Sequence, residues 1–77
     1  MKDLTLFILR KIVDKPEEIE VTESETETGN ITLTVKVSTE DMGKVIGKNG
    51  KVIRAIRDVV KILAVKLGKH VDIVLAE

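Results

Sequence analysis

The sequence predicts a small α+β domain with the element order α-β-β-α-α-β. Apolar residues recur at helical spacing over residues 3–14 and 51–67, and they alternate with polar residues over 31–37, as in a half-buried strand. Over 71–76, Val71, Ile73 and Leu75 alternate with Asp72, Val74 and Ala76. With 77 residues the chain can build one hydrophobic core of modest size, so we expect a single domain over residues 1–77.

The first helix is predicted over residues 3–14. Leu4, Phe7, Ile8 and Ile12 recur at helical spacing, and Pro16 ends the pattern. This apolar run is too short and too interrupted to cross a bilayer, and no small-residue cleavage site follows it. We therefore expect neither a signal peptide nor membrane insertion, and a cytoplasmic protein.

A β-hairpin is predicted next, with its turn at Gly29 and Asn30. The second strand is clear, because its apolar residues alternate strictly with polar ones from Ile31 to Val37. The register is open. A two-residue loop would pair the Thr and Ser residues of 22–28 with the apolar face, whereas a longer loop or a bulge would bring Ile19 and Val21 to that face.

The ends of the remaining helices are marked by capping and glycine signals in the sequence. Residues 38–41, STED, have the form of a capping box, an N-cap hydroxyl with a carboxylate three residues on, and they open a short helix. A GKNG turn follows it directly. The long helix over 51–67 is expected to end at Gly68, where a C-cap glycine is common, and 71–76 forms the last strand.

Composition argues against an enzyme. There is no Cys and no Ser/His/Asp set, and a lone His70 cannot form a metal cluster. We therefore expect no catalytic residues, no metal, no cofactor and no small-molecule substrate. Charge is strongly segregated: residues 14–41 hold nine acidic and two basic side chains, and 42–70 hold eight basic and one acidic. The basic half is a candidate surface for a polyanion.

The GKNG turn lies inside that basic half. Glycine lets a phosphate approach the main chain without meeting a Cβ, and the start of the following helix presents unpaired N–H groups. Lys48 and Lys51 add positive charge. The spacing of Gly43, Gly47 and Gly50 excludes both the nucleotide-hydrolase phosphate loop and the dinucleotide fingerprint. The alternative is a plain connection between two helices that has no ligand.

The long helix is two-sided. At 100° per residue its basic residues fall within an arc of about 120° and its apolar residues within about 200°, wider than a helix on a sheet requires. The basic arc consists of Lys51, Arg54, Arg57 and Lys61. Either the first helix covers the surplus apolar surface, or part of it is exposed as a groove floor or a self-association face.

Residues 45–53, VIGKNGKVI, resemble the V-I-G-x-x-G-x-x-I motif of the KH domain, whose GXXG loop holds the backbone of about four nucleotides. Nearly the whole chain is similar to the KhpA family of small bacterial single-KH proteins. This resemblance implies a type II KH domain, with helices packed on one face of a three-stranded mixed sheet. It also implies a set of RNA-binding residues: Lys44, Val45, Ile46, Gly47, Lys48, Asn49, Gly50, Lys51, Ile53, Arg54 and Arg57.

The resemblance gives these residues distinct roles. The four residues of the GKNG loop would hold the sugar–phosphate backbone, Ile46 and Ile53 would contribute to an aliphatic groove for bases, and Lys51 and Arg54 would flank it. It implies single-stranded RNA as the ligand, a homodimer, and a heterodimer with a KhpB-like protein. It further implies a cytoplasmic RNA chaperone or post-transcriptional regulator, linked to cell shape and cell-wall organisation. The alternative is a protein-interaction module with weak or no RNA binding.

Overall fold

A computed structural model describes residues 1–76, and it has the predicted order of helices and strands with two short 3₁₀ turns added. The elements are α1 (Lys2–Arg10), η1 (Pro16–Glu18), β1 (Glu20–Glu25), β2 (Asn30–Lys36), α2 (Met42–Ile46), η2 (Lys48–Gly50), α3 (Lys51–Lys66) and β3 (His70–Leu75). No helix among these residues combines the length and apolarity that crossing a membrane requires.

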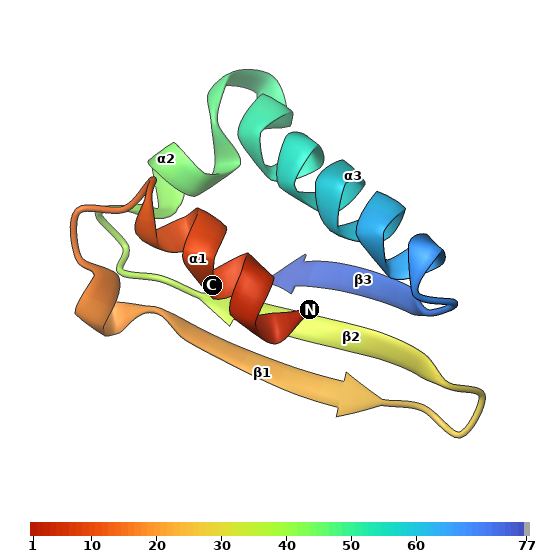
Figure 1. Ribbon diagram of the computed structural model, residues 1–77. Helices are drawn as coiled ribbons and strands as arrows, with labels where there is room; N and C mark the ends of the chain where they lie inside the picture. The colour runs from red at the N-terminus through yellow and green to blue at the C-terminus, as the bar shows by residue number, and fades with distance from the viewer. Residues whose placement is uncertain (77) are drawn as a thin grey trace.

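The three strands form one mixed sheet in the order β1-β2-β3. β1 pairs antiparallel with β2, and β2 pairs parallel with β3. All three helices lie on one face of this sheet, with α3 running along β3 in the opposite direction (Figure 1). The predicted fold class, an α+β domain with helices on one face of a mixed sheet, is confirmed. β3 is an outer strand of the sheet, so one of its edges is not paired with another strand among the described residues.

The hairpin resolves the open register in favour of a longer loop. Four residues, 26–29, connect the strands, and Val21 lies opposite Val35. Gly29 adopts φ +85° in this loop, which favours glycine. The Thr26 amide donates to the Asn30 carbonyl at 2.8 Å, and the Asn30 amide donates to Thr26 Oγ1 at 3.1 Å. Val21 therefore joins the core face of the sheet, while the threonines of β2 lie on the open face.

The first helix is shorter than predicted, since it ends at Arg10 rather than at residue 14. The amides of Lys11 and Ile12 donate to carbonyls three residues back, which tightens the last turn. The Val13 amide still donates to the Leu9 carbonyl, and the amides of Asp14 and Lys15 then donate to the carboxylate of Asp41 instead of continuing the helix. Val13 is buried, as the helical pattern predicted, although it lies beyond the end of α1.

The core lies between the sheet and α3. Leu33 and Val35 of β2 face Ile56 and Val60 of α3, and all four are buried. α3 ends at Lys66, one residue earlier than predicted, and Gly68, the predicted C-cap glycine, adopts φ +73°. The Gly68 amide donates to the Val65 carbonyl and the Lys69 amide to the Ala64 carbonyl, the two bonds of a Schellman motif. This end turns the chain sharply, so β3 returns beneath α3.

Candidate nucleic-acid interface

The GKNG loop connects α2 to α3 with a backbone that requires glycine at Gly47. Gly47 adopts φ +76° and ψ 171°, a region that is almost exclusive to glycine. A Cβ placed there would lie 2.3 Å from Val52 Cγ2 and 2.8 Å from the Val52 backbone nitrogen. The loop and the first turn of α3 are thus in direct contact, so Gly47 sets where α3 begins.

The next residues present the main chain to the surroundings. Asn49 and Gly50 both have positive φ, +57° and +72°, and the Gly50 amide donates to the Gly47 carbonyl at 3.1 Å. Within the described residues, the amides of Lys48 and Asn49 have no hydrogen-bond acceptor. They lie just before a 16-residue helix, whose dipole makes this end positive. The loop therefore offers backbone donors to an anion.

Basic side chains surround these donors. Lys48 and Lys51 are exposed, whereas Arg54 folds back on the loop. Its Nε donates to the Gly50 carbonyl at 3.3 Å, and its Nη2 donates to the Asn49 carbonyl. Because these bonds occupy two carbonyls of the loop, the oxygen atoms that would repel a phosphate are neutralised by a guanidinium. Arg54 therefore both braces the loop and adds charge beside it.

Further along α3, the basic arc faces the outer edge of the sheet. Arg57 is half-buried, and its Nε donates to the Ile73 carbonyl of β3 at 3.1 Å. One turn later Lys61 pairs with Asp72 at 3.8 Å. The basic side of α3 and the edge of β3 are thus linked at Arg57 and Lys61.

The apolar candidate residues divide into buried and exposed ones. Val45 is fully buried and Ile53 is nearly so, and both belong to the hydrophobic core. Ile46, 37% exposed, is the candidate whose apolar side chain is open to a ligand. Val45 and Ile53 therefore fix α2 and α3 on either side of the loop.

Lys44 is placed away from the other cations. Its Nζ forms a hydrogen-bonded ion pair with Asp14, in the turn after α1. This hydrogen bond is the main reason that the pKa of Lys44 is raised; desolvation opposes it, and the charges of Asp14 and Asp41 add to it. Of the candidate residues, Lys44 is the one whose charge is already paired with a carboxylate.

Asp41 is a structural anchor, and the sequence predicted only its bonding to Ser38. The capping motif predicts that the Asp41 amide donates to Ser38 Oγ, and it does so at 3.2 Å, while Ser38 Oγ donates to Asp41 Oδ2 at 3.0 Å. The carboxylate does not reach back to the Ser38 amide, as a capping box requires, but accepts the amides of Asp14 and Lys15, each at 3.0 Å. The Asp14 bond is the main reason that the pKa of Asp41 is lowered, with burial opposing it. Only the five residues of α2 separate this anchor from Gly47.

Residues 1–76 contain no group of three His, Cys, Asp or Glu side chains that could hold a metal ion. What they contain is an α-β-β-α-α-β chain, a mixed three-stranded sheet and a glycine-bracketed loop between two helices. Together these features define a KH domain with the hairpin before the helix pair, the type II arrangement.

Comparison with known proteins identifies the family. The family model "KhpA/KhpB, KH domain" matches residues 2–75. The RNA-binding protein KhpA of Clostridium perfringens is 52% identical over 71 residues, which cover 92% of this chain and 93% of the relative. That of Listeria monocytogenes is 40% identical over 77 residues, 100% of both chains, and that of Aquifex aeolicus is 32% identical over 77 residues, 100% of this chain and 96% of the relative. The chain belongs to the KhpA/KhpB KH-domain family. The names of these relatives describe RNA binding.

Proposed function

We propose that this protein, as one KH domain over residues 1–77, binds short single-stranded RNA across the GKNG loop. The observation that carries the proposal is the loop itself, with the amides of Lys48 and Asn49 open at the positive end of α3. Phosphate oxygens accept hydrogen bonds from these amides, and Lys48 and Lys51 supply charge. The relatives described above are named RNA-binding proteins.

The bases lie along the groove between α3 and β3. Ile46 offers apolar contact near the loop, and the exposed backbone edge of β3 offers donors and acceptors to base edges. The chain has one aromatic residue, Phe7, and it lies on α1, so stacking on aromatic side chains is not the mode of binding. Three or four neutralised phosphates give a slope of log affinity against log salt of about −2 to −3.

The test compares two variants on a fluorescent pool of short single-stranded RNAs. The first, Lys48→Asp with Asn49→Asp, places two carboxylates at the loop. The control, Lys36→Asp with Ser24→Asp, changes the charge by the same amount on the exposed strands of the hairpin. Circular dichroism establishes that each protein is folded.

The proposal predicts salt-dependent binding by the wild type and by the control, with at least about a tenfold loss in the loop variant, equal to 1.4 kcal/mol. If the folded loop variant binds as well as the control, the loop does not hold RNA. If the two variants lose affinity equally, the attraction depends on net charge and the site is not at the loop.

A second observation favours self-association or pairing with another KH-containing protein. The surplus apolar surface of α3 is not fully covered by α1, since Val59 is 45% and Ile62 68% exposed. Next to them, α1, the turn after it and α3 line an open hollow of about 530 Å³, whose lining is Ile8, Ile12, Lys51, Val52, Ala55, Ile56 and Val59. This apolar surface borders the basic arc at Lys51, since Ile62 lies about 20° and Val59 about 80° from Lys51 around the helix. We propose it as the interface of a homodimer, or of a heterodimer with a KhpB-like partner.

Sedimentation velocity over increasing protein concentration tests this interface. We expect the wild type to dimerise and Ile62→Asp to remain monomeric. Val74→Asp, a change at a 47% exposed position of β3, is the control and should dimerise like the wild type. A wild type that stays monomeric, or an Ile62→Asp variant that still dimerises, contradicts the proposed interface.

For the cellular role we propose a cytoplasmic RNA chaperone or post-transcriptional regulator that acts with such a partner. One domain that contacts about four nucleotides binds weakly, and pairing two domains raises the effective affinity. Effects on cell shape and cell-wall organisation would then follow from the RNAs bound.

A further inference from the structure

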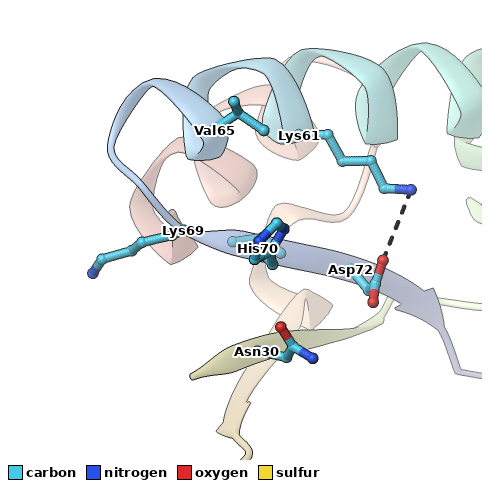
Figure 2. Close-up of a pocket in the computed structure, with 7 residues that line it drawn as sticks. Asn30, Lys61, Val65, Lys69, His70 and Asp72 are labelled. Carbon is cyan, nitrogen blue, oxygen red and sulfur yellow. Dashed lines mark ion pairs between the residues drawn. The ribbon is translucent and has the colours of Figure 1, made fainter. Parts of the chain in front are cut away.

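A hollow of about 400 Å³ lies at the far end of the groove, where α3 ends and β3 begins. Figure 2 shows its residues: Lys61 and Val65 come from α3, Lys69 from the turn before β3, His70 and Asp72 from β3, and Asn30 from the start of β2. This volume is within the usual range for sites that take a small organic ligand.

The hollow continues the basic side of α3. Arg54, Arg57, Lys61 and Val65 follow one another at steps of three or four residues, so they form one row on the helix. Val65 lies 15 residues beyond Gly50, about 22 Å along the helix at 1.5 Å per residue. Four nucleotides at the rise of a stacked strand cover about 14 Å, so a strand that starts at the loop and keeps this rise reaches the hollow only if it is longer.

Val65 is the unusual residue in this row. It is 66% exposed, lies among basic residues, and is not part of the hydrophobic core, so the packing of this domain does not account for it. Together with Val71, which is buried below it, Val65 gives the hollow an aliphatic surface. Aliphatic contact of this kind suits the face of a base.

The polar groups of the hollow are of two kinds, cationic or hydrogen-bond-donating groups and a carboxylate, and together they suit the phosphate and the base of a nucleotide. Lys69 and His70 are exposed donors at the outer end, suited to a phosphate. Asp72 repels a phosphate but accepts hydrogen bonds from the amino group of a base. Lys61 holds Asp72 at 3.8 Å in an exposed ion pair, a weak contact that a base can replace.

We infer that this hollow is a second nucleotide subsite, which takes one nucleotide of a longer RNA beyond those held near the GKNG loop. The base lies against Val65 with its edge toward Asp72 and Asn30, and its phosphate lies against Lys69. The inference rests on the proposed function, and it adds that the site extends over the full length of α3.

The test measures binding of a 4-nucleotide and an 8-nucleotide RNA of the same base composition. Lys69→Gln removes one charge from the hollow. Lys66→Gln removes one charge from an exposed residue that is rotated about 140° from Lys61 around α3, and it serves as the matched control. Since each comparison is made between variants on the same RNA, the number of binding positions along the RNA cancels.

One phosphate contact on a single strand contributes about 0.7 to the salt slope, which is about fivefold in affinity between 1 M and 0.1 M salt. We therefore expect Lys69→Gln to weaken binding of the 8-nucleotide RNA about fivefold at 0.1 M salt and to leave the 4-nucleotide RNA unaffected. Lys66→Gln should change neither. Val65→Ser, which removes apolar contact but no charge, should also weaken only the longer RNA.

Equal effects of Lys69→Gln and Lys66→Gln on the 8-nucleotide RNA would overturn the inference, as would equal losses on both RNAs. In both cases a loop-dependent affinity for the 4-nucleotide RNA would leave the proposed function intact. The proposed function fails if the loop variant, Lys48→Asp with Asn49→Asp, binds both RNAs with the same affinity as its control. The second subsite is then refuted as well.

Discussion

Replacing Gly47 by alanine should destabilise the domain far more than the same change at the other glycines near the loop. The backbone at φ +76° and ψ 171° costs a residue with a Cβ about 2 kcal/mol. The added Cβ would also lie 2.8 Å from the Val52 backbone nitrogen, which moves only if the start of α3 moves. We therefore expect a loss of about 3 to 4 kcal/mol in the free energy of unfolding, a large part of the stability of a domain of this size.

Two neighbouring glycines serve as controls. At Gly50, with φ +72°, a Cβ would meet nothing closer than Arg54 at 3.9 Å, so Gly50→Ala costs only the left-handed backbone, about 1 kcal/mol. Gly43 lies in α2 without positive φ and with open space around a new Cβ, so Gly43→Ala should stabilise the domain by about 0.5 kcal/mol.

Urea unfolding followed by circular dichroism measures these differences. With a denaturant slope of about 1 kcal/mol per M, the midpoint should fall by about 3 M for Gly47→Ala and by about 1 M for Gly50→Ala. The argument is refuted if Gly47→Ala is no less stable than Gly50→Ala, because the contact with Val52 would then carry no cost.

Two further predictions concern the core and the Asp41 anchor. Leu33→Ala, at a fully buried position, should lower the free energy of unfolding by about 3 kcal/mol, whereas Leu67→Ala, at a 66% exposed position, should change it by less than about 0.5 kcal/mol in the same urea titration. Because the pKa of Asp41 lies below its ordinary value of 3.8, this carboxylate stabilises the fold fully above that pH, and the contribution is lost as pH falls through its lower folded value. Asp41→Asn should therefore reduce stability at neutral pH, and its difference from the wild type should shrink in acid; a difference independent of pH contradicts this role.

The sequence by itself determined the order of the elements and the position of the loop. Periodicity along the chain and the glycines at Gly47, Gly50 and Gly68 are local signals, and each corresponds to a helix end or a turn in the structure. The motif of residues 45–53 was equally local, so the family was recognisable before any contact was known.

Only the tertiary structure decided which residues meet across the chain. The hairpin register depended on a loop whose length sequence alternation leaves open, and the carboxylate of Asp41 found the amides of Asp14 and Lys15 across 27 and 26 residues of sequence. The far hollow of the groove likewise needs β2 and β3 side by side, since that pairing brings Asn30 next to His70. A periodic pattern reports which side of an element is buried, but the packing of one element on another decides what each exposed side faces.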